Sequence, residues 1–146
     1  MLFDGVCGLC NGVTRFVLER DPGGRFHFAS LQSAPGRSAL APFGLNPDDL
    51  TTLYVLPDYR RASSTPLTKA RAALFVIARL GWPWKAAELL GVMPNAMLDR
   101  LYDLVARHRY RVFGREDTCP MPPPEYAARF IDLKTDTSPG LKGVTP

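Results

Sequence analysis

The pair of cysteines at Cys7 and Cys10 most constrains the fold, because it lies between two different local patterns. Residues 1–4 form a short apolar segment that predicts the end of a strand. Residues 11–20 place apolar side chains three and four positions apart, which predicts an amphipathic helix that ends at the Asp-Pro-Gly-Gly sequence of residues 21–24. The pair is therefore expected in a tight turn that leads from a strand into the amino terminus of a helix.

Strand and helix patterns alternate along the next part of the chain. Residues 25–30 have the period of a half-buried strand, and residues 51–57 are rich in strand-forming residues. Residues 67–80 predict a helix with Pro66 at its first position and Gly81 after its end. This order predicts an α/β fold with a sheet flanked by helices.

The length of 146 residues predicts one domain whose core needs no disulfide or structural metal. We expect this domain to span residues 1–132, with a helical extension at about residues 82–113. A proline-rich segment at residues 119–124 predicts irregular structure, and the polar residues 133–146 predict a loosely held tail. The three cysteines of the chain therefore need a chemical explanation.

The hydropathy and charge patterns argue against several classes of protein. The longest apolar run, residues 72–78, is far shorter than the roughly 20 residues that span a bilayer. The amino terminus lacks the basic and apolar regions of a secretory signal, so we expect a cytoplasmic protein. The net charge of +4 includes one basic cluster, residues 107–115, which is too small to predict nucleic-acid binding. We therefore expect neither membrane insertion nor a nucleic-acid partner.

The position of Cys7 and Cys10 predicts thiol chemistry. Unpaired backbone N–H groups and the dipole at a helix amino terminus would stabilise a thiolate on Cys7, which makes Cys7 the expected nucleophile. Cys10, one turn along, would resolve a mixed disulfide on Cys7. Asp4 lies three residues before Cys7 and would either relay a proton to or from Cys10 or cap the turn.

Other interpretations of the cysteine pair stay open. The two thiols would be inert buried groups, or they would bind zinc with Cys119 and His108 in a non-catalytic interaction module. The chain has a single C-x-x-C, whereas most structural zinc modules have a second closely spaced ligand pair. Cys119 itself would be a third redox thiol, a substrate-facing residue, or a cysteine that packs a loop onto the core.

Two arginines near the end of the last predicted helix have a functional and a structural interpretation. If Arg109 and Arg111 fold back toward the cysteines, they would stabilise the Cys7 thiolate or bind a carboxylate of the substrate. In the structural interpretation they end an amphipathic helix, where cationic side chains complement the helix dipole.

Several motifs of this chain occur together, and in the same order, in a known family. Residues 3–11 read Phe-Asp-Gly-Val-Cys-Gly-Leu-Cys-Asn and resemble the opening motif of the DCC-type thiol-disulfide oxidoreductases, a bacterial-rich family with an Asp-x-x-Cys-x-x-Cys signature. Asp4, Cys7 and Cys10 occupy the three named positions. The similarity covers about residues 2–132 and continues through motifs at residues 28–32, 73–81, 102–111, 113–115 and 119–120.

The resemblance implies a thioredoxin-like α/β fold and dithiol–disulfide exchange by Cys7 and Cys10, with no organic cofactor. The implied partner is a disulfide-containing protein or a low-molecular-weight thiol. Pro66 would be similar to the proline that faces the cysteines in thioredoxins, or it would be the first residue of a helix. The candidate substrate contacts are therefore Arg109, Arg111, Cys119 and Pro66.

Overall fold

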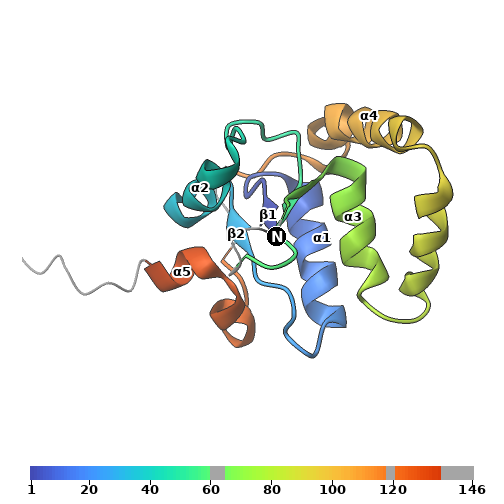
Figure 1. The fold of residues 1–146 in the computed structure, drawn as a ribbon. Helices are drawn as coiled ribbons and strands as arrows, with labels where there is room; N and C mark the ends of the chain where they lie inside the picture. Colours follow the sequence, from blue (N-terminus) through green and yellow to red (C-terminus); the bar gives the residue numbers. More distant parts are fainter. Residues whose placement is uncertain (60–64, 118–120, 136–146) are drawn as a thin grey trace, which may run out of the picture.

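A small mixed sheet lies between layers of helices in the computed structural model, which describes residues 1–59, 65–117 and 121–135 (Figure 1). The sheet has four strands in the order β2-β1-β3-β4. The strands are β1 (Leu2–Phe3), β2 (Ala29–Ser30), β3 (Tyr54–Val55) and β4 (Leu67–Thr68). Strand β1 is parallel to β2 and antiparallel to β3, and β4 is antiparallel to β3.

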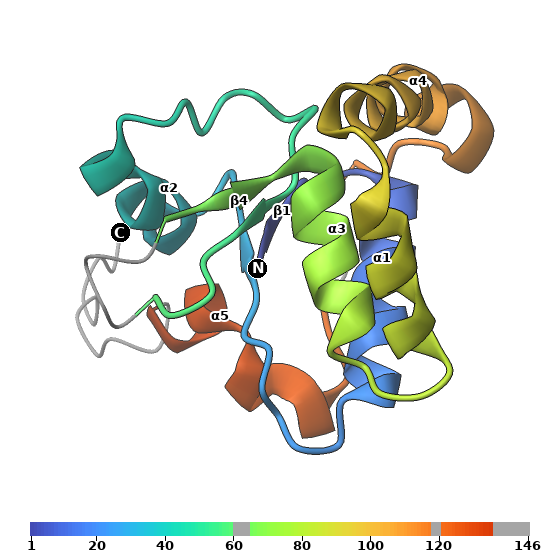
Figure 2. The same ribbon diagram turned by 45° about the vertical axis from the view of Figure 1, so that its right-hand side comes forward.

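Helices cover both faces of this sheet. The α-helices are α1 (Gly8–Arg20), α2 (Ala34–Leu40), α3 (Lys69–Ala78), α4 (Asn95–Phe113) and α5 (Ile131–Thr135). The 3-10 helices are η1 (Ala41–Phe43), η2 (Trp84–Val92) and η3 (Pro124–Arg129). Figure 2 shows α1 and α3 on one side of the sheet and α2 and α5 on the other. This mixed sheet flanked by helices confirms the expected thioredoxin-like α/β class.

Strands β1, β2 and β3 are buried, while β4 is half-buried. Successive side chains of a strand point to opposite faces of the sheet, so each buried strand packs against both layers. Phe3 belongs to one core cluster with Val17 of α1 and Val76 of α3. Its neighbour Leu2 belongs to a second cluster with Leu40 of α2. Strand β1 is thus fixed from both sides, and this fixes the position of the turn that follows it.

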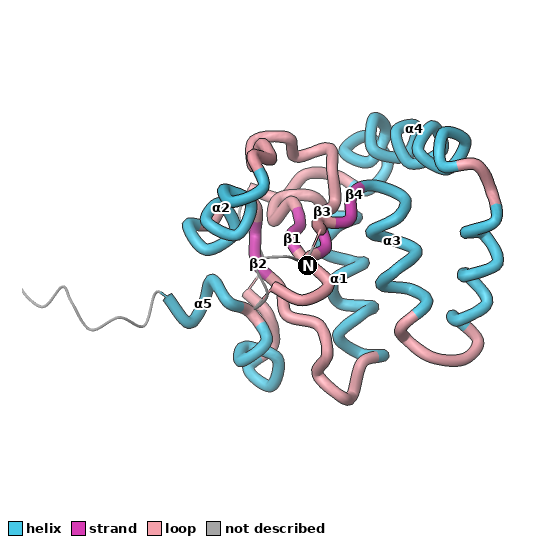
Figure 3. Tube along the Cα trace, in the orientation of Figure 1, coloured by secondary structure: helices cyan, strands magenta, loops and turns pink. Residues whose placement is uncertain are grey.

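The chain between β3 and α3 differs from the prediction. Residues 67–80 do not form one helix, because their first two residues pair with β3 as strand β4 (Figure 3). Lys69 has a φ of 51°, a left-handed conformation that turns the chain from β4 into α3, and its N–H donates to the Leu53 carbonyl at 3.1 Å. Tertiary pairing therefore overrides the local helix pattern, and the role of Pro66 as first helix residue is wrong.

The helical extension expected at about residues 82–113 is present as η2 and α4. Both elements contact α3, and α4 also contacts α1. Much of the apolar surface of the extension stays exposed, as in Trp82, whose exposed fraction is 90%. At the other end of the chain, α5 includes residues 133–135, and Leu133 packs against the core. These residues belong to the folded body and not to the predicted tail.

Helices long and apolar enough to cross a membrane are absent from the described part of the chain.

Candidate active site

The cysteine pair occupies the first turn of α1. The helix begins at Gly8, three residues earlier than the sequence predicts, so that Cys7 is its N-cap residue. The Cys7 backbone is extended, and its Sγ accepts a hydrogen bond from the Cys10 backbone N–H at 3.5 Å. Both cysteines are free thiols. A helix N–H group and the helix dipole are therefore directed at the Cys7 sulfur, as the sequence predicts.

The chain that leaves α4 covers the Cys7 side of this turn. Two backbone hydrogen bonds, of 2.8 and 3.3 Å, join residues 6–8 to residues 114–116, which we call the covering segment. Cys7 is 0% exposed beneath it. The approach is so close that a Cβ atom at Gly8 would lie 2.3 Å from the Phe113 carbonyl oxygen. Only glycine fits here, which explains the first residue between the cysteines.

Cys10 has a different environment from Cys7. It is half-buried, and its pKa is raised to about 12 by burial first, and then by the charge of Cys7 and a side-chain hydrogen bond with Cys7. The positive charge of Arg109 opposes this shift, and the charge of Asp4 adds to it. At neutral pH the Cys10 thiol therefore keeps its proton.

Asp4 is a buried carboxylate whose two oxygens are both hydrogen-bonded. Oδ1 accepts from the Gln32 side-chain amide at 2.8 Å and from the Val6 N–H at 3.2 Å. Oδ2 accepts from the Arg109 guanidinium at 3.0 Å and from the Tyr110 hydroxyl. The side chain of Asp4 is 0% exposed, and it joins residues 32 and 109–110 to the segment that leads into the cysteine turn. Its hydrogen-bond partners among the described residues include neither cysteine sulfur, so the proton relay stays a prediction.

Arg109 folds back toward the cysteines. Its Nη2 donates to Asp4, to the Leu50 carbonyl at 2.6 Å and to the Tyr110 hydroxyl at 2.9 Å. Its Nε is buried and has no hydrogen-bond partner in the described part of the chain. The side chain is 4% exposed, and its charge acts on Cys10. One of the two candidate arginines therefore belongs to the site.

Neither Arg111 nor Pro66 is among the described residues that line the apolar pocket at Cys10. Arg111 is exposed. Pro66 is half-buried ahead of β4, and the bond before it is trans, because the cis peptide of the described residues precedes Pro83. Cys119 lies outside the described residues. Their assignment as substrate contacts stays a prediction.

The zinc site considered from the sequence has no counterpart in the described residues. His108 is exposed, and its Nδ1 lies 2.9 Å from the Leu104 carbonyl oxygen. Clusters of three or more metal-ligating side chains are absent from residues 1–59, 65–117 and 121–135. Cys119, the remaining ligand of that interpretation, lies outside the described residues.

Sequence reasoning missed two members of the site, Gln32 and Tyr110. Gln32 also accepts from the Gly5 N–H at 3.2 Å, so it ties the turn before Cys7 to the chain after β2. Both residues lie inside the separated motifs, residues 28–32 and 102–111, that carry the family resemblance. These motifs were the one feature of the sequence that pointed to Gln32 and Tyr110, because neither residue is near Asp4 in the chain.

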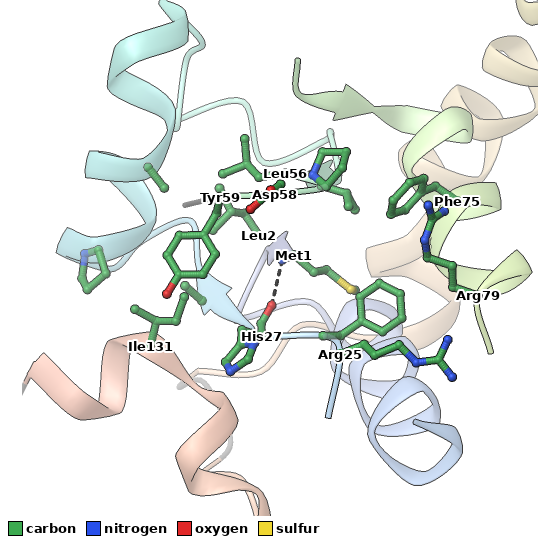
Figure 4. Close-up of a pocket in the computed structure, with 16 residues that line it drawn as sticks. Met1, Leu2, Arg25, His27, Leu56, Asp58, Tyr59, Phe75, Arg79 and Ile131 are labelled. Atoms are coloured by element: carbon green, nitrogen blue, oxygen red, sulfur yellow. Dashed lines mark hydrogen bonds between the residues drawn. The ribbon is translucent and has the colours of Figure 1, made fainter. Parts of the chain in front are cut away.

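An apolar pocket of about 300 Å³ adjoins Cys10. Residues from α1, α3, η2 and α4 form its walls, and Arg109 is among them. A second cavity, of about 320 Å³, lies near the start of β1 and is lined by Met1, Leu2 and His27 (Figure 4). Its described lining residues contain no cysteine. A third cavity, of about 670 Å³, lies beside the cysteine turn and is lined by Gly8 and Glu116. Of these three cavities, the apolar pocket has a cysteine of the pair among its described lining residues.

Comparison with known proteins agrees with this site. The family model of the DCC1-like thiol-disulfide oxidoreductases matches residues 1–115. The chain is 37% identical over 131 residues to "Uncharacterized protein YuxK" of Bacillus subtilis (strain 168), covering 90% of this chain and 92% of that protein. It is 37% identical over 120 residues to "DCC family protein At1g52590, chloroplastic" of Arabidopsis thaliana, covering 82% and 67%. No solved structure matches the chain. The chain belongs to the DCC1-like thiol-disulfide oxidoreductase family.

Proposed function

We propose that the protein exchanges a Cys7–Cys10 dithiol and disulfide with a disulfide-containing protein or a low-molecular-weight thiol. The observation that carries this proposal is the position of Cys7 as N-cap of α1, where its sulfur accepts from the Cys10 N–H. Hydrogen bonding and the helix dipole both favour negative charge on this sulfur. The family supports the general activity, thiol–disulfide oxidoreduction.

The exchange has two steps. The Cys7 thiolate attacks one sulfur of a substrate disulfide, so that a Cys7–substrate disulfide forms and the second substrate sulfur leaves as a thiolate and takes up a proton. Cys10 then loses its proton and attacks the Cys7 sulfur, which forms the Cys7–Cys10 disulfide and releases the first substrate sulfur. The substrate gains two electrons and the protein loses two. A protein or small-molecule thiol regenerates the dithiol by the reverse steps.

Asp4 and Arg109 are proposed as positioning residues for this chemistry. The high pKa of Cys10, about 12, means that its proton must be drawn away in the second step. The Arg109 charge lowers this pKa, and the Asp4 carboxylate fixes Arg109 through the 3.0 Å ion pair. Asp4 thus acts on Cys10 by fixing the Arg109 charge, and direct transfer of the Cys10 proton to Asp4 stays a prediction.

The covering segment controls the Cys7 step. Cys7 is 0% exposed, so a substrate sulfur reaches it only when residues 114–116 move away from residues 6–8. The two backbone hydrogen bonds that hold the segment are few enough for local opening without unfolding. The expected cytoplasmic location, where thiols are kept reduced, fits a catalytic pair and stays a prediction.

Single cysteine variants test the proposal directly. Cys7→Ser is expected to lower turnover of a fluorescent disulfide-linked peptide, with a thiol as reductant, by at least about 100-fold, because the attacking sulfur is lost. Cys10→Ser is expected to accumulate a mixed disulfide on Cys7, visible by mass spectrometry under non-reducing conditions.

Cys119→Ser tests whether the third cysteine takes part, because the proposed exchange uses Cys7 and Cys10 alone. Unchanged turnover in Cys7→Ser would overturn the proposal. Stoichiometric zinc in the purified protein that blocks alkylation of Cys7 and Cys10 would overturn it as well, in favour of the non-catalytic module.

A further inference from the structure

We infer that the apolar pocket beside Cys10 binds an uncharged, carbon-rich side chain next to the half-cystine of a peptide substrate. The inference rests on the proposed function and names the substrate class of that same site.

The walls of the pocket are almost entirely hydrocarbon. The pocket has a volume of about 300 Å³, at the lower end of the roughly 300–1,000 Å³ of small-molecule sites. Val13 of α1, Ala73 and Ile77 of α3, and Val105 of α4 line it together with Trp84 of η2. Such a cavity holds one aromatic or branched side chain rather than a large ligand.

The polar groups of the pocket indicate which charge a bound ligand can have. Arg109 is the charged residue among the described lining residues, and its ion pair with Asp4 leaves no net charge at this wall. Because this pair is neutral and buried, an ionised group of a ligand would lie against it without a partner of its own. An uncharged side chain on an uncharged peptide backbone avoids this cost.

The same features disfavour small amino-acid-like thiols. These thiols carry carboxylate and ammonium groups close to the sulfur, and the pocket would place such ions against hydrocarbon without compensating partners. A peptide presents an uncharged backbone and an apolar neighbouring side chain at the same distance from the sulfur.

The pocket also has the right position for the second step. Cys10 lines it, and the Cys10 N–H lies 3.5 Å from the Cys7 Sγ that carries the substrate in the mixed disulfide. Adjacent residues of a peptide have Cα atoms about 3.8 Å apart, so the neighbour of the substrate half-cystine reaches the pocket from there. Its binding would hold the mixed disulfide beside the resolving thiol.

A pair of peptides tests the inference. Two disulfide-linked peptides are compared that differ only in the residue after the half-cystine, which is Phe in one and Ser in the other. The expected kcat/KM is about tenfold or more higher for the Phe peptide, because a Phe side chain is buried on binding.

Val13→Phe should fill the pocket and bring this ratio close to one. Val112→Phe is the matched control, because Val112 is on α4 outside the pocket lining. Val13 and Val112 are 38% and 68% exposed, so both variants should fold. Equal kcat/KM for the two peptides in the wild type would overturn the inference.

A binding measurement separates this inference from the proposed function. The chain has two tryptophans, and Trp82→Phe leaves Trp84, in the pocket wall, as the single indole reporter. The S-methylated Phe peptide, which cannot exchange, should change the Trp84 emission in a saturable way, and the Ser peptide should not. If the protein turns over both peptides equally and the Trp84 emission does not change, the inference about the pocket is overturned while the proposed function stands. A saturable response without turnover of either peptide would support the pocket and overturn the proposed function.

Discussion

Helix α1 has a buried aspartate–arginine pair near each end, and the two pairs differ in how completely they are hydrogen-bonded. At the far end, Asp21 is the C-cap of α1 and pairs with Arg129. Each nitrogen of Arg129 donates, with Nε reaching the Phe26 carbonyl at 3.0 Å and Nη1 the Asp21 carbonyl at 3.1 Å. At the near end, Arg109 donates to Asp4 through Nη2, while its buried Nε has no partner among the described residues.

The difference separates a structural pair from a functional one. The Asp21 pair closes a loop, and each guanidinium nitrogen of Arg129 already has a protein acceptor. The Asp4 pair lies beside Cys10 and the apolar pocket, and it keeps one donor free. An incompletely satisfied buried group is what a binding or catalytic site is expected to contain.

The largest expected effect is on stability, and it is the same at both ends. Asp4→Asn and Asp21→Asn each leave a buried guanidinium without its counter-charge, which should lower the free energy of unfolding by about 3–5 kcal/mol. Urea denaturation of the two variants measures this. A loss below about 1 kcal/mol at either end would mean that the pair there is not the buried ion pair described above.

The next effect should distinguish the two ends. Asp4→Asn is expected to slow resolution of the mixed disulfide by about tenfold, because the lost ion pair no longer fixes Arg109 beside Cys10. Asp21→Asn should leave the rate unchanged when it is measured at a urea concentration and temperature where the variant is folded. Stopped-flow release of the substrate thiol gives this rate. Equal slowing in both variants would show that the effect is loss of stability.

Only the near end has a covering segment, and this gives a third test. Glu116→Pro removes the N–H that donates to the Val6 carbonyl at 2.8 Å and should raise the rate of Cys7 alkylation several-fold. Asp117→Pro, one residue further along, is the matched control. If the two variants alkylate at the same rate, the hydrogen bond at residue 116 does not limit access to Cys7.

The smallest expected effect is a decrease in the free energy of unfolding at alkaline pH, caused by buried groups near the amino-terminal end of α1. Burial is the main cause that raises the pKa of Cys10, and also that of Tyr102, to about 12. The folded state therefore keeps protons that the unfolded state releases from about pH 9 upward, so stability falls as the pH rises from about 9 toward 12. Cys10→Ser and Tyr102→Phe should each make this decline shallower in urea titrations at several pH values. If the free energy of unfolding falls with pH in both variants as it does in the wild type, burial does not raise the pKa values of Cys10 and Tyr102.

The sequence predicted the parts of the site that depend on local spacing. Cys7, Cys10 and Asp4 are neighbours in the chain, and the junction of strand and helix already directs N–H groups at Cys7. The α/β class followed from the alternation of patterns, and the length of the helical extension was close to that observed.

The remaining features depend on contacts between distant residues. Asp4 meets Gln32 across 28 positions and Tyr110 across 106, and no local pattern records such a pairing. Strand β4 was predicted as helix because its residues favour a helix until β3 pairs with them. Burial of Cys7 under residues 114–116 was likewise not predictable, since it depends on where α4 ends.

Redox equilibration of the intact protein tests the central claim most directly. The protein is held in thiol–disulfide buffers of graded potential, quenched with an alkylating reagent, and its cysteines are mapped by mass spectrometry. The proposed function predicts a single two-electron transition in which Cys7 and Cys10 form a disulfide while Cys119 stays a thiol. A Cys7–Cys119 disulfide, or no Cys7–Cys10 disulfide at any potential, would contradict it.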